Sequence, residues 1–149
     1  MKHFVIVVFL LIASAVHATA LPDEYYDQDV QQLIKTEYFA FGGVGYAGRT
    51  SRGEEAFGAI VKKKEAIRYM MAAFEHGNDC ARCYALVALR ESSPQLYHDS
   101  LAWFRKHLPK KIQFMSGCIM DDVDPREILT AIEAGRYADY FKEYEAKKG

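Results

Sequence analysis

Ser51–Gly77 reads SRGEEAFGAIVKKKEAIRYMMAAFEHG, and its apolar pattern indicates a helical protein. Ser51 and Glu54 match the S-x-x-E capping box, which predicts that a helix begins at this point. The apolar residues that follow recur at helical spacing, as on one buried face: Phe57, Ile60, Val61, Ile67, Met70, Met71 and Phe74. Gly77 is expected to end this helix as a left-handed C-cap.

The segments on either side show the same helical spacing in shorter stretches. Upstream, Asp23 is a candidate N-cap for a helix that extends to Ile34. Downstream, Asn78 or Asp79 is expected to cap the next helix, and Pro94 suits the first position of another. Asp124-Pro125 predicts a further helix start, which Gly135 interrupts.

Residues 110–118 (KKIQFMSGC) are the least helical part of the chain, and we expect an extended connection with one short strand at most. Alternating apolar and polar residues are almost absent elsewhere. The sequence therefore predicts an all-α fold, a single domain of five to six packed helices arranged as helix hairpins over residues 21–149.

The first 20 residues have the order of a cleavable signal peptide. Lys2 is basic, Phe4–Val16 is apolar apart from Ser14, and Ala18-Thr19-Ala20 offers small side chains for cleavage near Ala20. The apolar run is too short to cross a bilayer as a helix, so no membrane association is expected after cleavage. The sequence thus predicts a periplasmic or secreted protein that folds in an oxidising compartment.

Charge excludes one class of partner. The chain has 19 Lys and Arg against 20 Asp and Glu, a net charge of −1. Without a basic surface, neither nucleic acid nor an anionic membrane is an expected partner.

A glycine block, Gly43–Gly48, matches the G-x-G-x-x-G pattern of dinucleotide-binding loops. That motif needs a preceding strand in a βαβ unit, which the chain lacks, so we expect no nucleotide and no other cofactor. The glycines are then either a structural turn or a loop that presents side chains to a partner. The candidate residues for such binding are Gly43, Gly45, Tyr46, Gly48, Arg49 and Thr50.

Three cysteines leave three alternatives open. Cys80 and Cys83 form a C-x-x-C at a helix N-terminus, where the helix dipole and Arg82 would lower a thiol pKa as a redox enzyme requires. The preferred alternative is a structural disulfide from Cys118 to one of the pair, Cys83 before Cys80. The third is a Cys₃His zinc site that adds His76 to the three thiols.

Four segments resemble a family of secreted bacterial proteins of uncharacterised function. They are Tyr38–Gly48 (YFAFGGVGYAG), Gly53–Phe57 (GEEAF), Tyr84-Ala85-Leu86 and Ser116-Gly117-Cys118, and the glycine block is the most specific of them. The resemblance implies an exported helical protein. It implies no activity, ligand or catalytic residue.

The residues assemble no nucleophile, base and orienting group with the spacing of a catalytic site. We therefore expect a non-catalytic protein that binds another protein, with an oligomeric state that the sequence leaves open. The alternatives are a periplasmic thiol–disulfide protein and a small zinc-binding protein.

Overall fold

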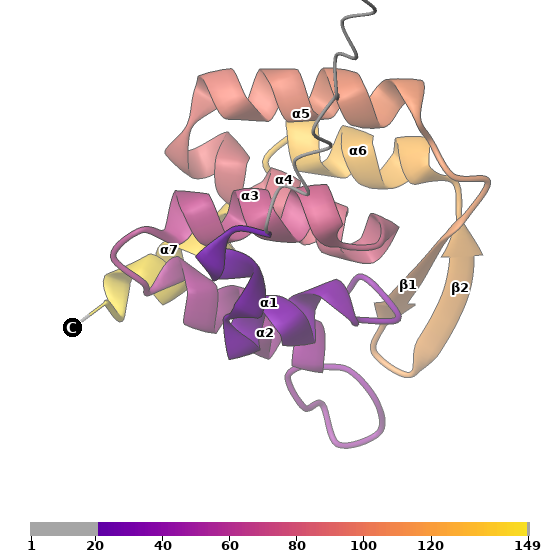
Figure 1. Cartoon of the computed structure of the whole chain (residues 1–149). Coiled ribbons are helices and arrows are strands. Elements are labelled where there is room, and N and C mark those ends of the chain that lie inside the picture. The colour runs from indigo at the N-terminus through magenta and orange to yellow at the C-terminus, as the bar shows by residue number, and fades with distance from the viewer. Residues whose placement is uncertain (1–20, 149) are drawn as a thin grey trace, which may run out of the picture.

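Helix α4 (Asp79–Ser92) lies at the centre of the fold in this computed structural model, which describes residues 21–148 (Figure 1). The α4 segment from Cys83 to Leu89 is entirely buried. Its neighbours in sequence, α3 (Ala66–His76) and α5 (Pro94–Lys106), pack against it. Asn78 caps α4 as predicted, since its Oδ1 accepts the Ala81 N–H at 2.9 Å.

Shorter helices complete the core around α4. They are the 3₁₀ helix η1 (Asp23–Tyr26), α1 (Gln28–Ile34), α2 (Arg52–Val61), α6 (Pro125–Glu133) and α7 (Ala138–Ala146). Residues 21–148 thus hold seven α-helices rather than the five to six predicted, and the mainly helical fold predicted from the sequence is confirmed. Two predicted helix starts are also confirmed, because Ser51 Oγ accepts the Glu54 N–H at 3.0 Å and Asp124 Oδ1 accepts the Arg126 N–H at 2.9 Å.

The single helix predicted from Ser51 to Gly77 is wrong, because the chain turns between α2 and α3 at residues 62–65. Lys63 holds this turn against α1, with its Nζ 3.1 Å from Asp27 Oδ2 and 2.8 Å from Asp29 Oδ2. The break lets α3 change direction and pack on α4. An apolar repeat that continues through a turn gives no sign of the turn in the sequence.

Two predicted helix ends also differ from the structure. Asp27 rather than Asp23 caps α1, with its Oδ1 accepting the Asp29 N–H at 3.0 Å. Gly77 has φ −85°, so it is not a left-handed cap. Glycine is needed there for space, since a Cβ would lie 2.3 Å from the Ala73 carbonyl oxygen.

An antiparallel hairpin corrects the all-α prediction. Strands β1 (Ile112–Ser116) and β2 (Ile119–Val123) pair from Ile112↔Val123 to Ser116↔Ile119. The extended connection predicted over residues 110–118 contains β1, whereas β2 was not predicted. The two-residue turn has Gly117 at φ +56° and no positive φ at Cys118, the pattern of a type II′ turn, which requires glycine at the first position.

Phe39 joins the other edge of β1. Its N–H donates to the Gln113 carbonyl at 2.8 Å, and its carbonyl accepts the Met115 N–H at 3.1 Å. Its ring is fully buried and packs edge-on against Tyr84 and Tyr137. This aromatic cluster connects the hairpin to α4 and to the C-terminal helices.

The Tyr84 hydroxyl fixes the segment that enters the glycine block. It donates to the Ala40 carbonyl at 2.5 Å and accepts the Ala40 N–H at 3.0 Å, and Ser51 Oγ lies 3.3 Å away. A side chain at Gly53 would place a Cβ 2.8 Å from this hydroxyl oxygen, so glycine allows the close approach of α2 and α4.

Candidate functional site

The glycine block forms a short, tightly bonded loop. Val44 and Arg49 exchange both backbone hydrogen bonds, at 2.8 and 3.0 Å, and close the turn between them. Gly45 and Gly48 have φ values of +69° and +59°, which side-chain-bearing residues rarely adopt. The glycines therefore have a structural role in shaping this loop.

A buried carboxylate ties the base of the loop to two helices. Glu54 Oε2 accepts the Gly42 N–H at 2.8 Å, and Glu54 Oε1 accepts the Tyr144 hydroxyl at 3.0 Å. Burial raises the pKa of Glu54 above its ordinary value, although both hydrogen bonds act in the opposite direction. The loop is thus anchored to α2, which carries Glu54, and to α7, which carries Tyr144.

The loop also contacts the turn of the β hairpin. The Gly45 N–H donates to the Gly117 carbonyl at 2.8 Å, and Val44 forms a bridge with Gly117. Two motifs that lie about 70 residues apart in the sequence therefore lie side by side. We define the tip surface as the exposed side chains of Tyr46, Arg49, Cys118, Ile119 and Met120.

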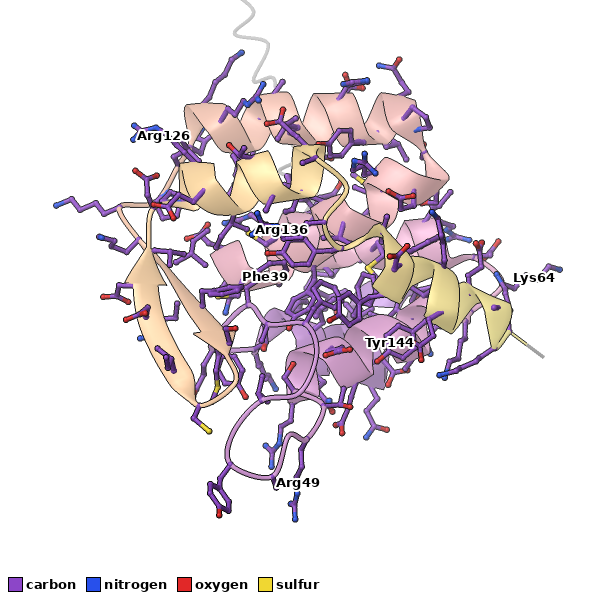
Figure 2. All side chains as sticks on the ribbon, turned by 180° about the vertical axis from the view of Figure 1, so that it is seen from behind. Phe39, Arg49, Lys64, Arg126, Arg136 and Tyr144 are labelled. Carbon is purple, nitrogen blue, oxygen red and sulfur yellow. The ribbon has the colours of Figure 1, made fainter. Side chains whose placement is uncertain are left out.

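The tip surface exposes large hydrophobic side chains. Tyr46 is fully exposed (102%), Ile119 is 65% exposed and Met120 is 47% exposed. Among residues 21–148 these are three of only six large hydrophobic residues with such exposure. The Arg49 side chain points outward from the loop (Figure 2). Exposed tyrosine, methionine and arginine side chains on a rigid support are typical of protein–protein interfaces.

The loop does not offer a phosphate cradle. The N–H groups of Val44, Gly45, Gly48 and Arg49 donate to carbonyls of the chain itself. A phosphate loop needs such groups free and aimed at the ligand. Thr50, the last predicted binding residue, is exposed beside Arg49.

Cys80 and Cys83 lack the surroundings of reactive thiols. Both are buried, and Cys80 Sγ donates to the Glu37 carbonyl at 3.5 Å. Burial raises the pKa of the Cys80 thiol to about 11, and the Asp79 carboxylate adds to the shift. Burial also raises the pKa of Cys83 well above its ordinary value. These raised pKa values are opposite in direction to the lowered pKa that the redox alternative requires.

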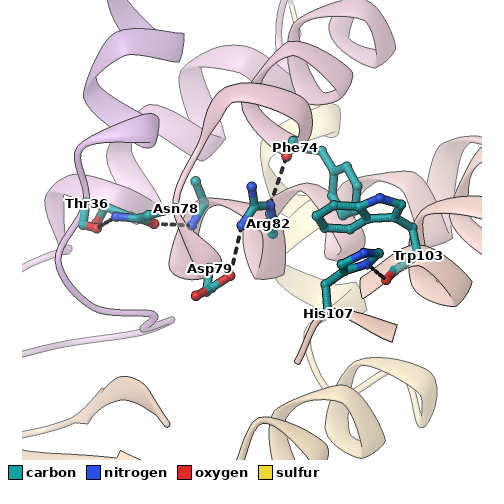
Figure 3. Close-up of polar contacts among 8 residues, drawn as sticks. Thr36, Phe74, Asn78, Asp79, Arg82, Trp103 and His107 are labelled. Carbon is teal, nitrogen blue, oxygen red and sulfur yellow. Dashed lines mark hydrogen bonds and ion pairs between the residues drawn. The ribbon is translucent and has the colours of Figure 1, made fainter. Parts of the chain in front are cut away.

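Arg82, expected to activate the thiols, is engaged elsewhere (Figure 3). Its Nη1 lies 2.9 Å from Asp79 Oδ1, its Nε donates to the Phe74 carbonyl at 3.2 Å, and its guanidinium lies 5.1 Å from the Trp103 ring centre. Arg82 therefore joins α4 to α3 and α5. His107 stacks on the same indole with 4.2 Å between the ring centroids.

All three thiols are free in this structure, and their exposure differs. Cys118 is exposed in the hairpin turn, whereas Cys80 and Cys83 lie in the core. The bridge between Cys83 and Cys118 therefore stays a prediction. His76 and the cysteines do not form the proposed zinc set, since no three histidine, cysteine or acidic residues between 21 and 148 converge on one point.

Two clefts lie away from the tip surface. A polar cleft of about 620 Å³ beside α1 is lined by Gln28, Gln31, Gln32, Lys35, Thr36, Glu37, Tyr38 and Arg52. A more apolar groove of about 410 Å³ between α3 and α5 is lined by Met71, Phe74, Glu75, Asp99, Ser100 and Trp103. Within residues 21–148 no helix combines the length and the hydrophobicity that crossing a membrane requires.

Comparison of the chain with protein-family models, with curated proteins and with solved structures gives no match. The four segments that carry the family resemblance do meet in space. Tyr84 bonds to Ala40 in the first segment and approaches Gly53 in the second, while Gly45 bonds to Gly117 in the fourth. They form one continuous support for the tip surface.

Ile119 and Met120 are the residues of this surface that the sequence analysis did not identify. They follow the turn of a hairpin that was read as a connection. The sequence feature that could have predicted the hairpin is Gly117 at the first position of a two-residue turn, directly after the strand-forming segment Ile112–Ser116.

Proposed function

We propose that this chain is an exported, non-catalytic protein that binds another protein through the tip surface. The observation that carries the proposal is that the glycine loop and the hairpin turn bond to each other and that both carry exposed hydrophobic side chains, Tyr46 on the loop and Ile119 and Met120 directly after the turn. Burying such side chains against a partner would stabilise a complex by removing apolar area from water.

Export is part of the proposal and rests on the sequence of residues 1–20, which lies outside the described residues. The redox alternative has less support, because the thiols of the C-x-x-C pair are buried and their pKa values are raised. The zinc alternative has less support because its four ligands do not converge.

Photo-cross-linking in the producing cell tests the proposal. A photoreactive amino acid replaces Tyr46 in one variant and Gln95, exposed on α5 at the opposite end of the molecule, in a matched control (Figure 1). We expect one discrete adduct from position 46 in the extracytoplasmic fraction and none from position 95. Adding Ile119→Ser should abolish the adduct, because it removes an apolar side chain from the tip surface. The change leaves the buried core intact, because Ile119 is exposed.

Equal adducts from both positions, or none from position 46, would contradict the proposal. An adduct that persists in the Ile119→Ser variant would show that the contact does not use the tip surface. Recovery of the chain in the cytosolic fraction, with residues 1–20 still attached, would contradict export.

A further inference from the structure

Strand β2 is the open edge of the small sheet. Phe39 bonds to the Gln113 carbonyl and the Met115 N–H on the far edge of β1, so these two β1 residues direct their backbone groups away from β2. In the antiparallel register Gln113 pairs with Asp122, and Met115 pairs with Met120. Met120 and Asp122 therefore direct their own N–H and C=O groups away from β1.

These outward backbone groups are almost unused. Between residues 21 and 148, no group outside the hairpin forms a hydrogen bond with the N–H or C=O of Met120 or with the N–H of Asp122. The Asp122 carbonyl accepts only Lys111 Nζ, at 3.4 Å. An exposed edge of this kind is a template for another strand, and proteins usually protect it with charged side chains, lysine above all, or with proline, a bulge or a covering element. Strand β2 (IMDDV) contains no lysine and no proline.

The charges on β2 indicate which strand would fit. Asp121 and Asp122 are exposed and form no ion pair with any residue in the range 21–148, whereas Asp124 pairs with Arg126 at 3.1 Å. A second copy of β2 added antiparallel around Asp121 would place like charges opposite each other, which is unfavourable. A basic strand would place opposite charges there.

We infer that β2 binds, as an added antiparallel strand, an extended partner segment with two adjacent basic residues followed by two adjacent apolar residues. The basic residues lie opposite Asp122 and Asp121, and the apolar residues lie opposite Met120 and Ile119. This inference rests on the proposed function, because β2 supplies two of the five side chains of the tip surface. It adds the backbone geometry and the charge of the bound segment.

Titration with synthetic peptides tests the inference on the purified protein. One labelled peptide has Arg-Lys-Val-Ile at its centre, and the matched peptide has Glu-Glu-Val-Ile. We expect the basic peptide to bind about tenfold more tightly, because two cross-strand charge pairs change sign between the peptides. The double change Asp121→Lys and Asp122→Lys should reverse this preference.

Met120→Pro tests the backbone component. It removes an N–H that β1 does not use, and proline is tolerated at such an edge position. We expect it to weaken the binding of the basic peptide by about tenfold while leaving the circular dichroism spectrum unchanged. A peptide N-methylated at the amides that would bond to β2 makes the same test without altering the protein, in case the proline variant does not fold.

Binding that survives both Met120→Pro and N-methylation would overturn strand addition, and equal affinity for the two peptides would overturn the basic specificity. Dimers of the unmodified protein that Met120→Pro dissociates would show that a second copy occupies the edge instead. If the adduct from position 46 forms but the peptides do not bind, this inference fails and protein binding at the tip surface stands. If neither is observed, both fail.

Discussion

At the scale of single residues, the Tyr84 hydroxyl connects α4 to two other segments of the chain. It satisfies both backbone groups of Ala40 and contacts Ser51 in a fully buried position. The residue thus supports the start of the glycine block and the N-terminus of α2 together.

We expect Tyr84→Phe to lower the free energy of unfolding by about 1–3 kcal/mol, because buried backbone groups of Ala40 lose their partner. Urea denaturation measures the change. Tyr97→Phe is the matched control, since the buried Tyr97 hydroxyl has no hydrogen-bond partner within residues 21–148 and its removal should be neutral or stabilising. Equal losses from both variants would contradict the role given to Tyr84.

Glu54 predicts a pH dependence of stability. Burial raises the pKa of this carboxyl in the folded state, so the folded state binds more protons than the unfolded state in the window above the ordinary glutamate pKa. Stability from this group is therefore greatest at low pH and declines as the pH rises through that window. Glu54→Gln should remove this component, so the variant gains stability relative to the unmodified protein as the pH increases.

Unfolding free energies measured by urea denaturation between about pH 4 and 7 would show this difference. Glu55→Gln, on the exposed side of the same helix turn, controls for the loss of a surface charge. If the free energies of unfolding of Glu54→Gln and of the unmodified protein differ by the same amount at every pH, the role given to Glu54 is contradicted.

The cysteines should differ in their rates of alkylation. In the native, reduced protein we expect Cys118 to react with a thiol reagent quickly, and Cys80 and Cys83 only after unfolding, because both are buried and their pKa values are raised. Peptide mapping after labelling assigns each site. Rapid labelling of Cys80 would restore the redox alternative. Absence of Cys118 labelling without reductant would indicate the Cys83–Cys118 bridge.

At the scale of elements, the tip surface depends on the hairpin turn. Gly117 has φ +56°, and no atom lies within 4 Å of a Cβ placed there, so a substitution is opposed by the backbone conformation alone. We expect Gly117→Ala to lower the free energy of unfolding by about 1 kcal/mol. The neighbouring exposed change Ser116→Ala is the control, and equal denaturation midpoints for the two variants would contradict this view of the turn.

Helices were predictable from the sequence wherever capping residues preceded an apolar repeat, as at Ser51, Asn78 and Asp124. The turn at residues 62–65 was not, because the ion pairs of Lys63 with α1 are tertiary contacts. The β2 strand was missed because Asp121 and Asp122 interrupt its apolar alternation, and its side chains are mostly exposed.

The candidate site was predictable only in part. The glycine block and its exposed residues Tyr46 and Arg49 were found from composition and local pattern. The contact of Gly45 with Gly117 could not be predicted, since it depends on how distant segments of the chain pack. The raised pKa of Cys80 could not be predicted either, because a helix dipole is a local feature of the sequence and burial is a property of the whole fold.

At the scale of the whole molecule, the glycine loop and α5 lie at opposite ends (Figure 1). Tyr84 at the centre of α4, Glu54 on α2 and Tyr144 on α7 all bear on the segment that forms the loop. The helical core therefore acts as a rigid support that presents the tip surface, and rigid presentation reduces the entropy lost on binding.

The most direct test of this account is the affinity of the cross-linked partner for Tyr46→Ala and Tyr26→Ala, measured by isothermal titration calorimetry. Both tyrosines are exposed, but Tyr26 lies in η1, away from the tip surface. The account predicts that Tyr46→Ala weakens binding by about tenfold or more and that Tyr26→Ala leaves it unchanged. Unchanged affinity in Tyr46→Ala, or an equal loss in Tyr26→Ala, would contradict the assignment of binding to the tip surface.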